Sequence, residues 1–243
     1  MASHFARWAL TDAGVPVQRL SQQVTEAASK LPERRRMRFL AARMLLAEML
    51  LRLYGISQLP EIALSPNGRP FFINAGLPDF SIAYAGNIVG VLLAEEGGKV
   101  GLDMEIVRAH SRQTLEQYAK EVTQAEKAWV RAQADPIEAA TQLWALRQSI
   151  VKLTDNKEKS ALQLHPASAR LRSQVLPQIE AISDVEPLII WSCAHSPGGE
   201  KLTLWEVNNT GWESLQAAPV RGQNMGPRAL RLISLPAEKA GFC

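Results

Sequence analysis

The chain has 243 residues, of which 47% are hydrophobic and 21% are charged. This composition is typical of a soluble globular protein, and the length fits one large domain or two modest ones with a sizeable core. The two cysteines, Cys193 and Cys243, exclude a disulfide framework and favour a reducing cytoplasm.

No stretch of the sequence predicts export or insertion into a membrane. The N-terminus MASHFARWAL lacks the apolar core of a signal peptide. The most apolar stretch, FLAARMLLAEMLLRLYG, is shorter than a bilayer span and is interrupted by Arg43, Glu48 and Arg52. We therefore expect a cytoplasmic protein with no membrane partner.

The charge balance is mildly basic, with a formal net charge of +3 and a sequence pI of about 9.0. Such a balance suits anionic small ligands or acidic protein partners. No basic stripe is interleaved with aromatic residues, so we expect no nucleic acid partner. The densest basic run, Arg34–Arg38, is either a solvated helix face or an anion site.

The first half of the chain predicts one long helix followed by short strands. The helix begins near Pro32, which suits a first helical turn, and ends at Gly55. A turn is predicted at Ser65–Pro70 from its composition. Hairpin connections are expected at Gly86-Asn87 and at residues 95–99. The strands themselves are expected at residues 70–73, 80–84, 88–94 and 100–106.

The second half predicts two helices and a late hairpin. Capping boxes open the helices at Thr123 and at Asp135, and the second helix is expected to reach Lys152. Residues 155–185 are expected to form a loop with one short strand. Residues 187–193 and 201–207 are expected to form a hairpin, and the tail from residue 211 gives no prediction.

This order of elements predicts an α+β fold with two similar lobes related by pseudo-two-fold symmetry. The first lobe would comprise residues 1–107 and the second residues 108–243. The similarity rests on layout, because FSIAYAGNIVGVLLAEE and IIWSCAHSPGGEKLTLWEV share a strand-turn-strand pattern.

Two carboxylates stand out in the strand-like run KVGLDMEIVR. Val100, Leu102 and Met104 alternate with small or acidic residues, so Asp103 and Glu105 project from the same face. Like charges on one face destabilise a strand unless something positive lies between them, and a hard divalent cation prefers such oxygen ligands. From the residues alone, a metal site and ordinary strand-edge acids are both open.

A second set of side chains shares one face of the helix that follows Asp135. Trp144, Gln148 and Lys152 stand at i, i+4 and i+8, and Arg147 adjoins them. A tryptophan at such a position is usually part of a core, and a lysine near a helix end is favoured by the helix dipole. The spacing alone does not distinguish a site from a packed helix.

Together these motifs resemble the signature of the 4'-phosphopantetheinyl transferase superfamily. VGLDME and, later, WALRQSIVK resemble the family motifs G-x-D-x-E and W-x-x-K-E-(A/S)-x-x-K. Ser65–Pro70 resembles the family's G-(K/R)-P turn, and the arginine-rich helix resembles its AR-x-LL helix. The resemblance covers residues 34–152 and is closest to the two-lobed, surfactin-synthetase-activating type.

The resemblance implies an enzyme that moves phosphopantetheine from coenzyme A to a serine of an acidic acyl or peptidyl carrier protein. It implies that Asp103 and Glu105 bind Mg²⁺, and that Glu105, Gln148 and Lys152 serve catalysis. The implied pathways are fatty acid, polyketide or non-ribosomal peptide synthesis, and we expect a monomer.

The implied contacts to coenzyme A come from several parts of the sequence. Arg43 and Arg69 would hold its phosphates, Tyr84 would donate a hydrogen bond, and Lys152 would contact the pyrophosphate or Glu105. Which arginines of the run 34–38 take part is not specified by the resemblance.

Two departures from the family pattern leave the activity open. Gln148 replaces a glutamate that would be a third metal ligand and a candidate base, and glutamine cannot accept a proton. Tyr84 and Ala83 replace a histidine and a serine. The chain is then an active transferase of the holo-[acyl-carrier-protein] synthase type, a weakened or inactive relative that binds coenzyme A or a carrier protein as a regulator, or an unrelated α+β protein.

Overall fold

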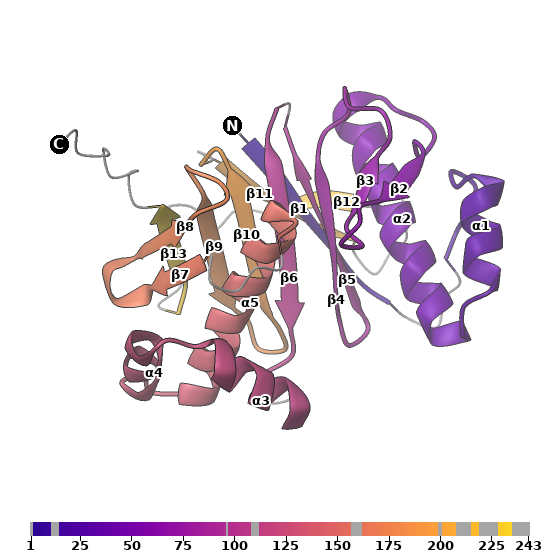
Figure 1. Cartoon of the computed structure of the whole chain (residues 1–243). Coiled ribbons are helices and arrows are strands. Elements are labelled where there is room, and N and C mark those ends of the chain that lie inside the picture. The colour runs from indigo at the N-terminus through magenta and orange to yellow at the C-terminus, as the bar shows by residue number, and fades with distance from the viewer. Residues whose placement is uncertain are drawn as a thin grey trace, which may run out of the picture.

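The computed structural model describes residues 2–10, 15–95, 97–107, 112–156, 162–198, 201–207, 215–218 and 228–234. The described helices and strands form the predicted α+β fold, with two main sheets and helices packed on each (Figure 1). None of the helices in these ranges is both long and apolar enough to cross a bilayer.

The first sheet has five strands in the order β12-β11-β1-β5-β4. Their bounds are Leu215–Ala218, Lys201–Val207, Ala2–Ala9, Ile88–Ala94 and Phe80–Ala85. Strands β1 and β11 run parallel, and the other neighbours are antiparallel. The predicted hairpin at Gly86-Asn87 is confirmed, because Ala85 pairs with Ile88 and Gly86 adopts φ +59°, which glycine accommodates readily.

Helix α2 (Glu33–Tyr54) covers one face of this sheet, and α1 (Gln22–Ser29) packs beside it (Figure 1). The predicted ends of the long helix are confirmed: Pro32 is its N-cap, and Gly55 ends it with φ +71°. A small third sheet pairs β2 (Ile62–Leu64) with β3 (Pro70–Phe72), and the predicted turn at residues 65–70 joins them.

The second sheet has six strands in the order β6-β10-β9-β13-β8-β7. Their bounds are Lys99–Glu105, Ile190–Ser196, Glu180–Val185, Leu230–Ser234, Arg170–Ser173 and Leu162–His165, with a short 3₁₀ helix at Pro166–Ser168. Helix α5 packs on one face of this sheet, near α3 and α4 (Figure 1). These helices span Pro136–Thr154, Arg112–Glu121 and Gln124–Arg131.

Both predicted helix starts in the second half are confirmed. Thr123 accepts a hydrogen bond from the Glu126 N–H, and Glu126 reaches back to Thr123 in a complete capping box. Asp135 caps α5 by accepting from the N–H groups of Ile137 and Glu138, with proline at the first helical position. The last helical residue is Thr154, two residues beyond the predicted end.

Two predicted hairpins are wrong because the strands join different sheets. Strand β10 pairs with β6 and β9, whereas β11 pairs with β1 and β12, so residues 187–193 and 201–207 do not form a hairpin. Residues 95–99 likewise link β5 of the first sheet to β6 of the second. The shared layout of the two halves therefore does not extend to their pairing. Short apolar runs separated by a glycine-containing linker look alike whether they pair with each other or with distant strands.

The predicted loop at residues 155–185 is also wrong, since it contains β7, β8 and β9. Strand β8 shows why its composition appears polar: Leu171 is fully buried between the exposed Arg170 and Arg172. The division at residue 107 stays a prediction, as does the two-fold relation. The sheets do not follow that division, because β6 joins the second sheet while β11 and β12 join the first.

The faces of the two sheets that carry no α2 or α5 share a hydrophobic cluster. It includes Phe5 and Leu92 of the first sheet with Leu102 and Trp191 of the second. Separate clusters lie under α2 and under α5. The two sheets are thus joined through buried apolar side chains.

The boundary between β4 and β6, which we call the seam, is held by side chains. These are the outer strands of their sheets. The carboxylate of Asp79 accepts from the Val100 N–H and the hydroxyl of Ser81 from the Leu102 N–H, each at 2.9 Å. Arg69 Nη2 donates to the Val100 carbonyl at 3.0 Å. Buried backbone groups that a neighbouring strand would bond are satisfied here by side chains.

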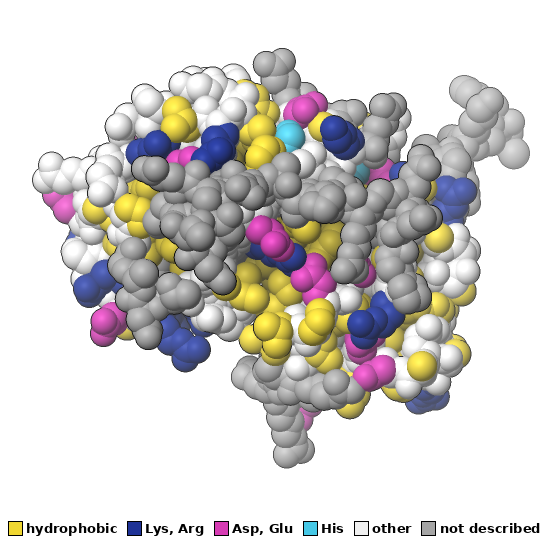
Figure 2. Space-filling model, turned by 180° about the vertical axis from the view of Figure 1, so that it is seen from behind, with side chains coloured by type: hydrophobic (Ala, Val, Ile, Leu, Met, Phe, Trp, Pro, Cys, Tyr) yellow, Lys and Arg dark blue, Asp and Glu magenta, His cyan; other side chains and the backbone are white. Residues whose placement is uncertain are grey.

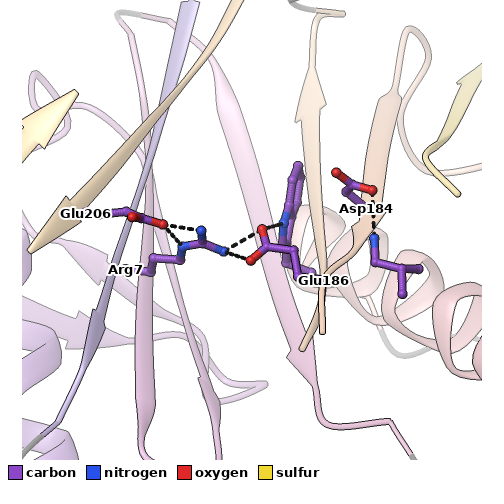
Figure 3. Close-up of polar contacts among 6 residues, drawn as sticks. Arg7, Asp184, Glu186 and Glu206 are labelled. Carbon is purple, nitrogen blue, oxygen red and sulfur yellow. Dashed lines mark hydrogen bonds and ion pairs between the residues drawn. The ribbon is translucent and has the colours of Figure 1, made fainter. Parts of the chain in front are cut away.

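An ion-pair cluster makes a second link between the sheets. Arg7 of β1 contacts both carboxylate oxygens of Glu186, at 2.6 Å each, in the turn between β9 and β10. Its Nε donates to Glu206 of β11 at 2.7 Å, so Arg7 lies between the two acids (Figure 3). Seen from behind, acidic and basic side chains meet among hydrophobic ones near the middle of the molecule (Figure 2).

Gly101 lets α5 lie directly against β6. A Cβ atom at Gly101 would overlap the carbonyl oxygen of Ser149 and would lie 2.6 Å from the amide nitrogen of Leu153. Both obstacles are helix backbone, which cannot move aside without shifting the helix. The close approach brings the α5 side chains within reach of the β6 acids.

We predict that Gly101→Ala lowers the free energy of unfolding by about 3 kcal/mol or more, because it overpacks a rigid contact. Gly90→Ala is the matched control, since its Cβ would meet the thioether of Met104, a flexible end that can shift. The control should cost about 1 kcal/mol. Urea denaturation measures both, and equal losses would contradict the close-packing account.

Candidate active site

The structure brings the acids of β6 and the side chains of α5 together. Lys152 Nζ donates to Asp103 Oδ1 at 2.7 Å and to the Leu102 carbonyl at 2.9 Å. Trp144 Nε1 donates to Glu105 Oε1 at 3.2 Å. Asp103 and Glu105 therefore share the face that the alternation predicted, and both sequence motifs meet in one place.

The electrostatics of the pair favour a cation. The pKa of Glu105 is raised to about 7, first by burial and then by the nearby charge of Asp103, while the hydrogen bond from Trp144 and the charge of Lys152 partly oppose the rise. Two carboxylates held this close repel each other when both are ionised. Added positive charge relieves that repulsion.

Gln148 lies between the two contacts that α5 makes with the pair. It is one helical turn from Trp144 and one from Lys152, and it is half-buried. Within the described ranges, Gln148 makes no hydrogen bond, and no group of three or more His, Cys, Asp or Glu side chains could hold a metal ion. Two carboxylates nevertheless fit Mg²⁺, which takes few ligands from protein and fills the rest with water and phosphate.

A basic cluster flanks the seam on the β4 side. Tyr84 is 38% exposed, and its hydroxyl bonds to Arg43 of α2. The charge of Arg38 also acts on Tyr84. The guanidinium of Arg43 lies over the ring of Phe39, 3.3 Å from its centroid. Burial lowers the pKa of Arg43, but an arginine remains charged, so this cluster can receive an anion.

The rest of the basic run is less suited to that role. The guanidinium of Arg36 donates to the carbonyls of Ala28, Ser29 and Leu31, at 3.1–3.3 Å, and so caps the end of α1. Arg34 and Arg35 are exposed on the first turn of α2. Burial raises the pKa of the Tyr84 hydroxyl, and of the run 34–38, Arg38 is the arginine whose charge acts on Tyr84 to lower that pKa in part.

Arg69 is built into the seam. Its Nη2 is 2.5 Å from Asp79 and also contacts the Phe80 and Val100 carbonyls. Asn67, in the same turn, donates to the carbonyl of Asp155 at the end of α5, so the turn contacts α5 as well as the seam. The Nε of Arg69 is buried and has no hydrogen bond among the described residues. A phosphate-binding role for Arg69 stays a prediction, and its bonds to the seam are observed.

Arg147 points away from the acids. Its Nη2 donates to Glu126 at 2.6 Å and its Nη1 to the Leu162 carbonyl at 3.2 Å. The side chains of Arg147 and Glu126 are 5% and 1% exposed. Arg147, within the motif WALRQSIVK, therefore forms an ion pair with Glu126 that fixes α4 to α5.

Sequence reasoning missed several residues that shape the site. Asp79 and Ser81 were passed over because their targets are backbone groups of another sheet, which no local pattern reveals. For Trp144 the spacing leaves a packed core residue and a site residue both open, and the structure shows that it is both. It does pack, edge-on against Tyr118 with ring centroids 5.6 Å apart, while its N–H serves Glu105.

We predict that Arg147→Met lowers the free energy of unfolding by about 3 kcal/mol, because it leaves the Glu126 carboxylate buried without its cation. Adding Glu126→Gln removes that charge and keeps a side chain able to complete the capping box. The double variant should therefore be more stable than Arg147→Met alone. Urea denaturation compares them, and a double variant less stable than the single one would contradict this role.

The amino-acid sequence is similar to those of several known proteins. It is 42% identical over 248 aligned residues to the uncharacterized protein YieE of Escherichia coli K12, covering 99% of this chain and 98% of YieE. No protein-family model matches it. It is 37% identical over 75 residues to the 4'-phosphopantetheinyl transferase AcpT of Salmonella typhi, covering 30% of this chain and 35% of AcpT.

A third relative is similar to this chain over a longer segment than AcpT. The chain is 30% identical over 135 residues to a Haemophilus influenzae protein provisionally named a 4'-phosphopantetheinyl transferase, covering 54% of this chain and 55% of the relative. The chain belongs to the family of YieE and is related, over part of its length, to proteins named 4'-phosphopantetheinyl transferases.

Proposed function

We propose that the protein is a 4'-phosphopantetheinyl transferase that uses coenzyme A and a carrier-protein serine. One observation carries the proposal: the acids of one motif, Asp103 and Glu105, are bonded by Lys152 and Trp144 of the other. Side chains of two motifs far apart in sequence are thus in direct contact, as a single site requires. The partial relatives named as such transferases support it.

In this proposal Asp103 and Glu105 hold Mg²⁺. Both are oxygen ligands on one face of β6, and their mutual repulsion favours a cation. When bound, Mg²⁺ neutralises charge on the pyrophosphate of coenzyme A as the leaving group departs. Gln148 lies one turn from each α5 contact and can hydrogen-bond a water of the ion through its amide.

The phosphates of coenzyme A would lie along the seam. Lys152 reaches the pyrophosphate from α5, beside the acids. Arg43 and Tyr84, with Arg38, offer charge and hydrogen-bond donors on the β4 side. Arg69 holds the seam through its bonds to Asp79 and to the Val100 carbonyl, and its guanidinium is our candidate for a further phosphate contact.

The proposed reaction joins the serine oxygen of the carrier to the phosphorus that bears pantetheine. The bond from that phosphorus to the bridging oxygen breaks, and the bridging oxygen leaves with the electron pair as adenosine 3',5'-bisphosphate. The serine proton must go to a base. Glu105 is our candidate, because it is a carboxylate within the site, whereas the amide of Gln148 cannot accept a proton.

The chain's charge suits the proposed partner. A net charge of +3 favours long-range attraction to an acidic carrier protein. A cytoplasmic location and a monomeric state belong to the same proposal.

We predict that the protein adds one phosphopantetheine to an apo carrier protein when coenzyme A and Mg²⁺ are present, as measured by mass spectrometry. Asp103→Asn and Glu105→Gln should each lower the rate by about 100-fold or more, because each removes a ligand or the base. Glu26→Gln, on the exposed face of α1, is the matched control and should leave the rate unchanged.

The same assay separates the alternatives. Tight binding of coenzyme A without transfer to any of a panel of carriers would contradict the enzyme and favour a weakened relative that acts as a regulator. Neither binding nor transfer would contradict both.

A further inference from the structure

The acid pair already holds a cation that belongs to the protein. Lys152 Nζ is 2.7 Å from Asp103 Oδ1 and 2.9 Å from the Leu102 carbonyl oxygen. An ammonium group has three donors, and these two contacts use two of them. Lys152 thus neutralises one of the two carboxylates that a metal ion would use.

The two partners of this ion pair differ in freedom. The side chain of Asp103 is 9% exposed and stands on a strand that is paired with β10 on one edge. The side chain of Lys152 is 36% exposed and lies in the last turn of α5. Because lysine has a long flexible stem, Lys152 is the partner that can move while Asp103 stays in place.

Lys152 and a metal ion would compete for Asp103. Two cations on the same carboxylate oxygen repel each other strongly, since they would be only a few ångströms apart in a half-buried site. Helix position favours the lysine, because the C-terminal end of a helix attracts positive charge. Gln148 adds no third carboxylate that would favour the metal.

Phosphate changes this balance. A pyrophosphate bound beside the acids would give Lys152 other anionic oxygens to bind. It would also supply the metal ion with oxygen ligands that the protein lacks. Both effects release Asp103 to the metal. The ligand that reverses the competition is therefore the substrate itself.

We propose that Lys152 is an internal counter-ion that closes the acid pair in the free protein, and that coenzyme A draws Lys152 onto its phosphates so that Asp103 becomes available to the metal. This inference rests on the proposed function and adds to it the order in which coenzyme A and the metal bind. Metal binds poorly to the free protein and tightly together with coenzyme A. By linkage, the metal tightens coenzyme A binding by the same factor.

The test measures Mn²⁺ binding to the full chain by electron paramagnetic resonance, with and without coenzyme A and with no carrier protein present. In the wild type, coenzyme A should lower the Mn²⁺ dissociation constant by about 10-fold or more, within the usual range of coupling between sites. Lys152→Met should lower that constant about 10-fold without coenzyme A and should shrink the effect of coenzyme A. Lys152→Gln, which keeps a donor for the Leu102 carbonyl, should behave alike.

Lys99→Met is the matched control for a simple loss of positive charge. Lys99 is exposed and lies on β6, the strand that carries both acids. It should leave Mn²⁺ binding and its coupling to coenzyme A nearly unchanged. Equal effects of Lys99→Met and Lys152→Met would overturn the counter-ion proposal.

Two further outcomes separate this inference from the proposed function. If coenzyme A binds the wild type, by calorimetry, but Mn²⁺ binds equally well with and without it, the counter-ion proposal fails and the transferase proposal stands. If coenzyme A does not bind at any Mn²⁺ concentration, both fail.

Discussion

One edge of β6 has no neighbouring strand among those described, and side chains make the hydrogen bonds that such a strand would make. The rest of the site depends on this arrangement. Asp79 and Ser81 accept from the N–H groups of β6, while Arg69 and Lys152 donate to its carbonyls. A strand edge without partners would be costly to bury. These polar side chains let two sheets meet without merging, and they leave charged groups on both sides of the seam.

The neighbouring helix completes the arrangement. Gly101 allows α5 to approach β6 so closely that Trp144 and Lys152 bond the two acids. Arg147 of the same helix is directed to α4 and is buried against Glu126. Helix α5 thus carries two kinds of contact. Trp144 and Lys152 bond the acids of the candidate site, and Arg147 forms the buried ion pair that anchors the helix.

Local sequence patterns correctly predicted the features that depend on neighbouring residues, namely helix ends and the faces of strands. Pro32, Gly55 and the caps at Thr123 and Asp135 marked helix ends correctly, and strand alternation placed Asp103 and Glu105 on one face. Pairing over long distances was beyond such patterns. The parallel contact of β1 with β11 and the assignment of β10 and β11 to different sheets follow from packing of the whole chain. For the same reason Asp79 and Ser81 were missed, although both bond the backbone of β6.

The central claim is that the acid pair on β6 is where metal and the pyrophosphate of coenzyme A meet. Crystals of the protein grown with coenzyme A and Mn²⁺ test it most directly, because anomalous scattering locates the metal. We expect a manganese ion bound to Asp103 and to pyrophosphate oxygens, with Lys152 on a phosphate. Coenzyme A bound with manganese away from Asp103, or bound far from the seam, would contradict it.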